Sequence, residues 1–585
     1  MSARKLLLGN EAIAEAVLAS GVGVAAAYPG TPSTEIMEHL ASVSHGRFHA
    51  EWSVNEKVAL ETCAGASYSG VRSLCAMKHV GLNVAMDPFM TLAYTGITGG
   101  LLLIVADDPG MHSSQNEQDS RHLVGAAKLM CFEPANSQEA HDMVLEAYAL
   151  SEKLELPMVL RTMTRVAHTA TPVVLKEHKS HTPTAFIKNS QKYVMVPAFA
   201  RQRHKWLLEK QKEIAEYVES SPFNSLEMKG NEETGIVACG SAYNLAREFS
   251  KGCAILKCGT WPIPEKKLAL LASKVKKIIV LEEGDPIVEK MVHCIHKNVR
   301  GKLTGDLPLD GELLPEYVMK ALGVDEKPLR KISVQLPPRP PMLCPGCPHR
   351  ATYHVLKQKG RDVVCGDIGC YTLGVQKPLG VLDTCLCMGA SINKAAGMYY
   401  AGNKKVYAVI GESTFIHSGI TGLMNSVYNG AEFILIIFDN HNTAMTGHQP
   451  TPLTGLRADG SMGKAMNLEK ICVACGVEYV RRYDPKNLAD VKDAFREGEE
   501  KTGVRVLIAD SPCIMYKNAP RGPPQAVDQS KCIKCKACMQ LGCPAITEEA
   551  DGSIAIKEIM CTGCALCAQV CPKKAIKQYD GSKRF

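Results

Sequence analysis

The 585-residue sequence predicts an α/β protein built on parallel sheets and followed by a short cysteine-rich domain. Three observations indicate this. Short apolar runs alternate with amphipathic stretches in several regions, as strands joined by crossover helices do. Hydrophobic residues make up 46% and charged residues 22% of the chain, the balance of an ordinary globular protein. Eight of the 24 cysteines fall near the end, where the alternation stops.

Residues 1–180 are predicted to form the first of two doubly wound parallel-sheet domains. The apolar runs Val22–Tyr28, Ser73–Met77 and Leu101–Ala106 are the expected strands. The sequence Asp107-Asp108-Pro109-Gly110 after the third run is a typical loop signal. This arrangement predicts a parallel sheet with its loops at the strand ends.

Residues 181–233 are predicted to be a connector. They contain a charged helical stretch at about 198–218, and Ser220-Ser221-Pro222 then interrupts the helical pattern. Strand-like runs resume afterwards, at Thr234–Cys239 and Lys277–Leu281. Residues 234–333 are therefore expected to form a smaller α/β domain.

A proline-rich segment, Val334–Pro348, is expected to be a stiff linker. Beyond it, residues 342–517 are predicted to form the second doubly wound parallel-sheet domain, on the strands Val406–Ile410, Ile434–Asp439 and Val504–Ala509. Residues 525–585 lack this alternation and are predicted to form a separate small α+β domain around the clustered cysteines.

The cysteines of residues 525–585 form two runs, each closed by Cys-Pro. The runs read Cys532-x2-Cys535-x2-Cys538-x4-Cys543-Pro544 and Cys561-x2-Cys564-x2-Cys567-x3-Cys571-Pro572. The second run has the spacing of bacterial two-cluster ferredoxins, and the first has one extra residue before its fourth cysteine. Zinc knuckles also use Cys-x2-Cys pairs and are the alternative interpretation.

In two-cluster ferredoxins the fourth cysteine of each run binds the cluster of the other run. This pattern predicts two [4Fe–4S] clusters. The first would be bound by Cys532, Cys535, Cys538 and Cys571, and the second by Cys543, Cys561, Cys564 and Cys567. Such a domain transfers single electrons.

Two strand ends in residues 342–517 carry metal-ligating side chains. One strand ends in Gly411-Glu412-Ser413, and the next along the chain ends in Asp439-Asn440-His441-Asn442. Strand carboxyl ends of α/β sheets bind ligands, and Mg²⁺ prefers carboxylate, carbonyl and phosphate oxygens. The alternative is two ordinary strand-end loops.

This pair of segments resembles the thiamine-diphosphate motif, in which Gly-Asp-Gly is followed some two dozen residues later by Asn. The chain departs from it with Glu412 and Ser413. The resemblance implies thiamine diphosphate near Gly411, Glu412 and Ser413. It also implies Mg²⁺ on Glu412, the Asn440 side chain and the Asn442 backbone carbonyl.

A second resemblance lies near the N-terminus. The segment Tyr28-Pro29-Gly30-Thr31-Pro32-Ser33, with Glu56 some twenty-five residues on, is similar to the pyrimidine-binding domain of 2-oxoacid:ferredoxin oxidoreductases. It implies that Glu56 is the catalytic carboxylate beside the aminopyrimidine ring and that Thr31 lies near the substrate. Without the resemblance, Glu56 would be interpreted as a surface residue of a helix.

The order of the predicted parts is similar to the α subunits of indolepyruvate:ferredoxin oxidoreductases over essentially the whole chain. Residues 1–180 would then be the thiamine pyrimidine-binding domain, 342–517 the thiamine-diphosphate-binding domain and 525–585 the ferredoxin domain. The resemblance implies oxidative decarboxylation of aryl pyruvates with CoA and oxidised ferredoxin to aryl-acetyl-CoA, CO₂ and reduced ferredoxin. It also implies a smaller β subunit, as in an α2β2 complex.

Three alternatives stay open at this point. The first is a 2-oxoacid oxidoreductase with another substrate, and the second is a non-oxidative thiamine-dependent decarboxylase or synthase. The third is a non-catalytic electron-transfer subunit. The resemblance further suggests a third cluster on Cys344, Cys347, Cys370 and Cys513. Reduced core cysteines are the alternative for that group, and Cys385, Cys387, Cys472 and Cys475 are interpreted in the same way.

No arginine clearly matches the one that binds the substrate carboxylate in related enzymes, so Arg121, Lys78 and His79 are candidates. A net charge of +7 without an arginine-rich arm argues against nucleic acid. The sequence has no run of about twenty apolar residues, so no membrane span is predicted. Glutamates before the apolar stretch Val17–Ala27, and glycines within it, argue against a secretory signal, so a cytoplasmic enzyme is expected.

Overall fold

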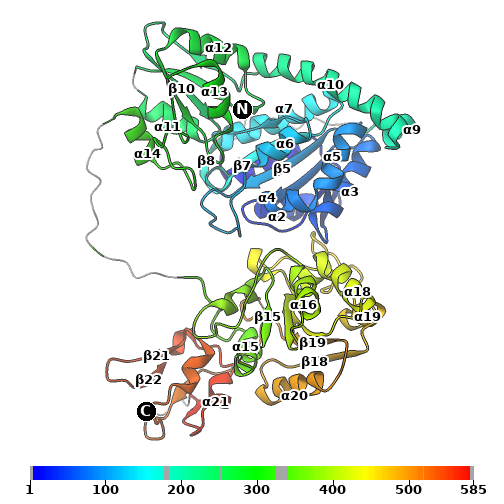
Figure 1. Cartoon of the computed structure of the whole chain (residues 1–585), viewed down its shortest axis with the longest axis vertical. Coiled ribbons are helices and arrows are strands. Elements are labelled where there is room, and N and C mark those ends of the chain that lie inside the picture. The colour runs from blue at the N-terminus through cyan, green and yellow to red at the C-terminus, as the bar shows by residue number, and fades with distance from the viewer. Residues whose placement is uncertain are drawn as a thin grey trace. The chain divides into compact units, whose positions relative to one another are not determined.

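The computed structural model describes residues 4–176, 183–250, 252–324, 334, 340–360, 362–517 and 519–579. The chain divides into two compact units, Met1–Val334 and Gln335–Phe585, which are described separately (Figure 1). Residues 335–339 of the expected proline-rich linker lie outside the described residues. No helix in the described ranges is long and apolar enough to cross a membrane.

The first unit contains a seven-stranded sheet in the order β12-β6-β7-β5-β4-β2-β3. Its strands are β2 (Val24–Ala27), β3 (His49–Trp52), β4 (Ser73–Lys78), β5 (Leu101–Asp107), β6 (Cys131–Phe132), β7 (Met158–Met163) and β12 (Thr260–Trp261). All pairs are parallel except that of the edge strand β12 with β6. The three strands predicted from apolar runs are confirmed as β2, β4 and β5.

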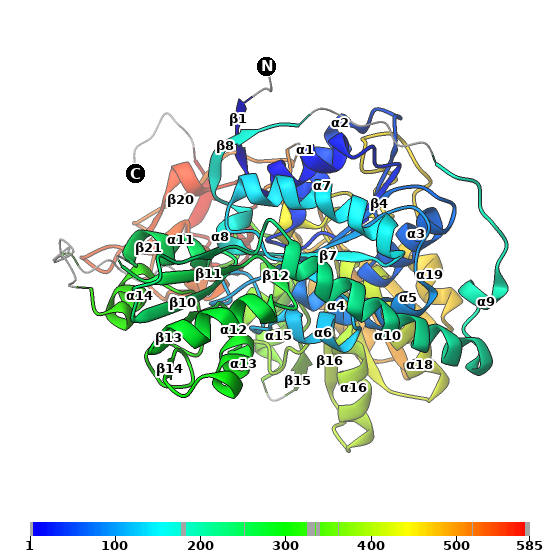
Figure 2. The ribbon, with the colours of Figure 1, turned by 90° about the horizontal axis from the view of Figure 1, so that it is seen from above.

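Helices cover this sheet because their apolar faces need a partner. Helices α1 (Gly9–Ala19) and α7 (Ser137–Leu154) pack against each other, as the view from above shows (Figure 2). Helix α3 (Glu56–Tyr68) packs on β2 and β4. The remaining helices around the sheet are α2 (Thr34–Ser44), α4 (His79–Val84), α5 (Met86–Thr95) and α6 (Ser120–Ala126).

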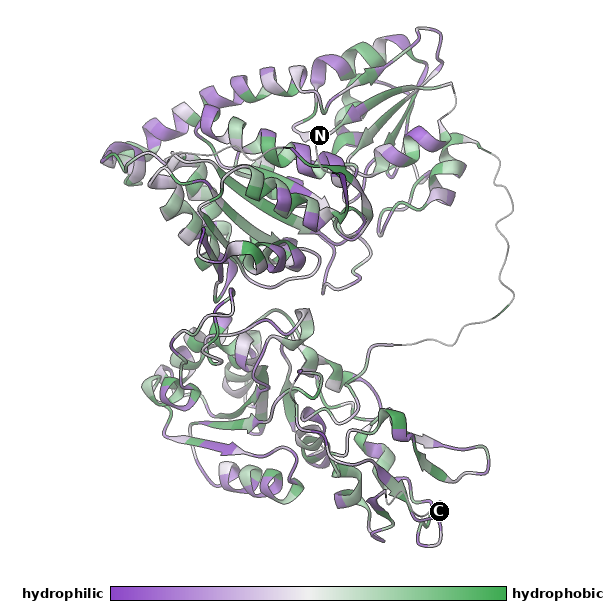
Figure 3. Cartoon of the chain, turned by 180° about the vertical axis from the view of Figure 1, so that it is seen from behind, coloured by the Kyte–Doolittle hydropathy of each residue, from purple (hydrophilic) through white to green (hydrophobic). Residues whose placement is uncertain are grey.

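The charged stretch between the two sheets of this unit is the helix α10 (Pro197–Ser220), as predicted. Its mixed hydropathy is visible in Figure 3, and only Leu207, Ile214 and Val218 are buried. It leads to a five-stranded sheet in the order β14-β13-β10-β11-β9. The strands are β9 (Leu226–Glu227), β10 (Thr234–Cys239), β11 (Ala254–Cys258), β13 (Lys277–Leu281) and β14 (Val299–Arg300).

The second unit is centred on a fully parallel sheet in the order β15-β16-β17-β19-β18. Its strands are β15 (Val363–Cys365), β16 (Val406–Gly411), β17 (Phe433–Asp439), β18 (Tyr479–Tyr483) and β19 (Val504–Asp510). The predicted strands are confirmed to within one residue at each end. Helices α15 (His349–Gln358), α16 (Ala390–Tyr400), α18 (Ile420–Tyr428) and α20 (Leu488–Glu499) flank it.

The cysteine-rich end of the chain folds onto this unit. It contains two antiparallel pairs, β20 (Gln525–Val527) with β23 (Ile576–Gln578) and β21 (Ile546–Glu548) with β22 (Ile554–Ile556). Helix α21 (Leu566–Val570) lies between the second pair and β23 in sequence. Its buried residues, Leu566 among them, belong to the same hydrophobic core as the strands β16 and β17.

Candidate active site and cysteine sites

The expected magnesium ligands meet at the carboxyl ends of β16 and β17. Glu412 follows β16 directly and is 1% exposed. The Asn442 backbone N–H donates to Glu412 Oε1 at 3.0 Å and to Asn440 Oδ1 at 3.3 Å. Burial, and then the negative charge of Asp439, raise the pKa of Glu412 to about 8. A buried carboxylate among amide and carbonyl oxygens is a donor set that a hard divalent cation fits.

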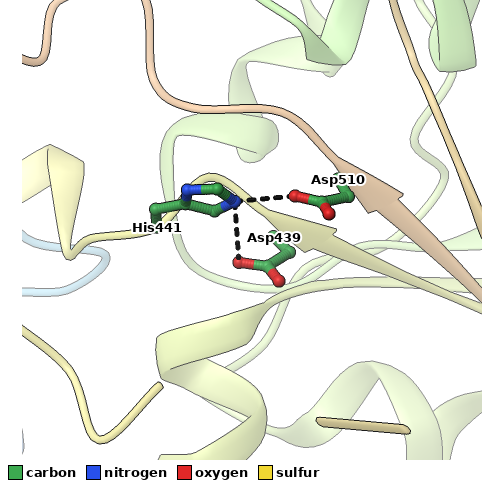
Figure 4. A group of neighbouring side chains, drawn as sticks. All are labelled: Asp439, His441 and Asp510. Atoms are coloured by element: carbon green, nitrogen blue, oxygen red, sulfur yellow. Dashed lines mark hydrogen bonds and ion pairs between the residues drawn. The ribbon is translucent and has the colours of Figure 1, made fainter. Parts of the chain in front are cut away.

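The loop that carries Asn440 is fixed by an ion-pair network (Figure 4). His441 Nε2 lies 2.6 Å from Asp510 Oδ1 and 4.0 Å from Asp439 Oδ1. Arg482 Nη1 contacts the other oxygens of these carboxylates, Asp510 Oδ2 at 2.8 Å and Asp439 Oδ2 at 3.1 Å. Because Arg482 and His441 each contact both aspartates, this group holds the loop in place.

Asp367 supports the site but was not among the predicted site residues. It follows β15, is fully buried and accepts hydrogen bonds from the backbone N–H groups of Gly389 and Ser391 at 2.9 and 2.8 Å. It thereby fixes the start of α16 beside the same edge of the sheet. Its place between a short apolar run and Cys370 was the sequence signal for it.

The structure brings together the four cysteines suggested for a third cluster. Burial raises the pKa of the Cys347 and Cys370 thiols to about 12. Negative charge on Cys344 further raises the pKa of the Cys347, Cys370 and Cys513 thiols. The negative charge of Glu412 also raises the pKa of Cys370 and of Cys513. The Cys513 N–H donates to the Asn440 carbonyl at 3.0 Å. The group therefore lies next to the expected magnesium ligands.

The two cysteine runs line two cavities in the way that the ferredoxin pairing predicts. The inner cavity is lined by Cys543, Cys561, Cys564 and Cys567. The outer cavity is lined by Cys532, Cys535, Cys538 and Cys571. Each cavity therefore takes three thiols from one run and the fourth from the other.

The inner cavity adjoins the Cys344–Cys347 segment. Pro345, Gly346 and Arg350 line it, and a Cβ on Gly346 would lie 1.9 Å from Thr562 Oγ1. Arg350 is 2% exposed and donates to the carbonyls of Cys344 and Leu541. The outer cavity is lined only by residues 527–576. Elsewhere in this unit, Cys385 and Cys387 are exposed, so their interpretation as core residues was wrong.

In the first unit, the expected catalytic residues lie at the carboxyl ends of the parallel strands. Asn55 caps α3 by accepting from the Val58 N–H at 2.9 Å, which places Glu56 in the first turn. Glu56 is 5% exposed, and a Cβ on Gly81 would lie 2.6 Å from its Oε1. The interpretation of Glu56 as a surface residue is therefore wrong. Thr31 follows β2, and its carbonyl accepts from Ser113 Oγ at 3.1 Å.

Arg121 does not bind the substrate carboxylate, because it is already neutralised in the core. It is 1% exposed and contacts Asp119 at 2.6 Å and Glu282 at 2.9 Å. Lys78 and His79, the other candidates, end β4 and begin α4. The Lys78 amine donates to the Ser113 carbonyl at 3.0 Å, and His79 Nε2 lies 3.2 Å from the Asn116 carbonyl.

Comparison with known families matches both units. Residues 15–222 match the model of the pyruvate flavodoxin/ferredoxin oxidoreductase thiamine-diphosphate-binding domain. Residues 367–509 match the C-terminal TPP-binding domain of thiamine pyrophosphate enzymes. The first match includes Thr31 and Glu56, and the second includes Glu412, Asn440 and Asn442. The chain is thus a thiamine-dependent oxidoreductase.

Curated relatives extend the likeness to nearly the full length. The indolepyruvate oxidoreductase subunit IorA of Archaeoglobus fulgidus is 42% identical over 98% of this chain and 97% of its own length. The same subunits of Methanothermobacter marburgensis and Pyrococcus abyssi are 41% and 39% identical over the same shares. The chain therefore belongs to the indolepyruvate oxidoreductase subunit IorA family, within the 2-oxoacid:ferredoxin oxidoreductases.

Proposed function

We propose that the chain oxidatively decarboxylates aryl 2-oxoacids such as indolepyruvate and delivers the electrons to ferredoxin, with CoA taking the acyl group. The observation that carries this proposal is the full-length identity of about 40% to subunits named indolepyruvate oxidoreductase. The two cysteine-lined cavities support the oxidative reaction, because a decarboxylase without electron transfer has no use for them. They disfavour the non-oxidative alternative.

The thiamine-diphosphate site is proposed at the ends of β16 and β17. Glu412, the Asn440 side chain and the Asn442 carbonyl would hold Mg²⁺, and Gly411 and Ser413 would adjoin the diphosphate. Thiamine diphosphate supplies the electron sink for loss of CO₂. Glu56 would exchange a proton with the aminopyrimidine ring, for which a buried carboxyl group is suited. Thr31 would contact the 2-oxoacid.

Three [4Fe–4S] clusters would conduct the electrons. The group Cys344, Cys347, Cys370 and Cys513 would hold the one nearest Glu412, and the inner cavity would hold the next. The outer cavity would hold the last, where Cys535 is exposed. This order follows from the contact of the inner cavity with Pro345 and Gly346 and from the composition of the outer cavity. The cysteine-rich end would thus be a two-cluster ferredoxin domain.

Iron counting tests the third cluster. The anaerobically purified protein should contain about twelve iron atoms, since each of three clusters holds four. Cys370→Ala should lose about four, while Cys475→Ala, which changes a half-buried cysteine outside the three groups, should lose none. Eight iron atoms in both the wild type and Cys370→Ala would contradict the third cluster.

The family to which the chain belongs also suggests its partners. The relatives are named as subunits, so a smaller β subunit is expected, with α2β2 as the proposed stoichiometry. Lys536 and Lys573 line the outer cavity and would attract an acidic ferredoxin. The cysteine content supports a reducing, cytoplasmic location.

Turnover of a 2-oxoacid panel tests the proposal. The complex with its β subunit is supplied anaerobically with CoA, oxidised ferredoxin and either indolepyruvate, phenylpyruvate, pyruvate or 2-oxoglutarate. We expect the highest kcat/KM for the aryl substrates, with reduced ferredoxin and acyl-CoA formed together. Equal or better use of pyruvate would contradict the substrate class, and aldehyde release without ferredoxin reduction would favour the non-oxidative alternative.

A further inference from the structure

Lys78 occupies the strand-end region of the first unit that also carries Thr31 and Glu56. It is the last residue of β4, whose neighbours in the sheet are β2 and β5. Its side chain packs against the loop after β2, since a Cβ on Gly30 would lie 3.3 Å from both Lys78 Cγ and Cδ. Lys78 is thus adjacent to the loop that contains Thr31.

The Lys78 amine has donors to spare. It is a nearly buried group, 8% exposed, and within the described ranges its one hydrogen bond goes to the Ser113 carbonyl. An ammonium has three N–H donors, so two remain for another acceptor. Burial lowers the pKa of Lys78 to about 8, and the negative charges of Asp108 and Glu56 oppose that shift. The amine is therefore largely charged at neutral pH.

Asp108, whose negative charge acts on Lys78 more strongly than that of Glu56, is occupied by other hydrogen bonds. Asp108 accepts hydrogen bonds from the Ser113 N–H, the Ser114 hydroxyl and the Thr164 hydroxyl, at 2.8, 2.7 and 2.8 Å. No ion pair within 4.0 Å joins Asp108 or Glu56 to Lys78 among the residues described. Arg121, by contrast, is neutralised by Asp119 and Glu282.

The contacts of Ser113 connect this amine to Thr31. The Ser113 carbonyl accepts from Lys78, and the Ser113 hydroxyl donates to the Thr31 carbonyl at 3.1 Å. The ammonium therefore lies at a fixed place beside the loop proposed to contact the 2-oxoacid. A carboxylate there would meet a desolvated cation, where a charge-assisted hydrogen bond is strongest.

We propose that the Lys78 ammonium binds the carboxylate of the 2-oxoacid substrate. The inference rests on the proposed function and assigns to Lys78 the role that Arg121, already paired with Asp119 and Glu282, does not fill. A lysine offers a point charge where an arginine would form a bidentate pair. When the carboxylate leaves as neutral CO₂, this contact ends, and the ammonium returns to its single acceptor, the Ser113 carbonyl.

Paired ligands distinguish this role from simple anchoring of the Ser113 loop. The ligands are 3-(indol-3-yl)propionate, an anion without the reactive carbonyl, and its uncharged amide. Binding to the thiamine-loaded complex is measured by calorimetry. We expect Lys78→Met to lower the affinity for the anion by roughly 10- to 100-fold, the range for a hydrogen bond to a charged group. The affinity for the amide should stay unchanged. Lys78→Arg should restore part of the anion affinity.

The matched control is Lys153→Met, which removes an exposed lysine of the same unit and should change neither affinity. Equal weakening of anion and amide by Lys78→Met would show that Lys78 only anchors the loop and would overturn the inference, as would unchanged binding of both. A wild type that holds thiamine diphosphate but turns over no aryl 2-oxoacid would instead overturn the proposed function. The two failures are therefore distinguishable.

The pH dependence of anion binding gives a second readout. The titratable groups around the amine are Asp108 after β5, Glu56 on α3 and the neighbouring His79 on α4. Since Lys78 loses its proton as the pH rises, anion affinity of the wild type should fall above about pH 8. In Lys78→Arg the charge persists, so the affinity should stay level to higher pH. A parallel fall in both proteins would contradict the assignment.

Discussion

Glu56→Gln is expected to abolish turnover, with kcat lower by roughly 10²- to 10⁴-fold, the range for loss of a general acid–base group. The amide has nearly the shape of the carboxyl group, so it fits the space beside Gly81 and leaves the first turn of α3 capped by Asn55. It cannot exchange a proton with the aminopyrimidine ring. Thiamine-diphosphate affinity should stay close to that of the wild type, because the proposed diphosphate ligands are unchanged.

The measurement combines steady-state kinetics with cofactor binding on the same preparations. Glu61→Gln is the control, since Glu61 is exposed on the same helix and pairs with Lys57 at the surface. Its kcat should be that of the wild type. Near-normal turnover of Glu56→Gln would remove Glu56 from the mechanism. Loss of cofactor binding together with activity would show a binding role instead.

Glu412→Gln is the second change with a large expected effect. It removes the only full negative charge among the three proposed magnesium ligands. Mg²⁺ affinity should fall by roughly 100-fold or more, beyond the 10- to 100-fold typical of residues that only support a ligand. Thiamine diphosphate, whose diphosphate shares the ion, should be lost with it. The amide oxygen can still accept from the Asn442 N–H, so the loop should keep its conformation.

Thermal unfolding separates this effect from a folding defect. Burial raises the pKa of Glu412 to about 8, so ionised Glu412 is unfavourable in the metal-free protein. The metal-free variant should therefore unfold at the same temperature as the metal-free wild type or higher, and only the stabilisation by Mg²⁺ and cofactor should vanish. Glu500→Gln, an exposed change on the same unit, should retain that stabilisation. A metal-free variant that unfolds at a lower temperature than the metal-free wild type would indicate a structural role for Glu412.

Much of the fold could be predicted because buried parallel strands are continuous apolar runs. The runs at β5, β10 and β13 agree with the structure to within one residue. The edge strand β12 could not be found this way, because two residues carry no periodicity and its partner β6 lies over a hundred residues earlier. Pairings of that kind depend on tertiary packing.

Some features of the candidate site could likewise be predicted from the sequence, and others could not. Spacing indicated the three close cysteines of each run, and the pattern of two-cluster ferredoxins added the crossed fourth one, a grouping that agrees with the linings of the two cavities. The sequence could not separate Arg121 from Lys78, because the difference lies in their partners. Arg121 contacts Asp119 two residues away and also Glu282 from a distant strand end. Lys78 keeps unused donors because Asp108 is occupied by hydroxyl and backbone groups.

In the proposed reaction, electrons from an aryl 2-oxoacid leave through the iron–sulfur clusters of this chain. The decisive measurement is electron paramagnetic resonance of the anaerobic complex, frozen after mixing with indolepyruvate in the absence of external ferredoxin. We expect the signal of reduced [4Fe–4S] clusters in the wild type and none in Glu56→Gln. Consumption of indolepyruvate with all clusters still oxidised would contradict this route for the electrons.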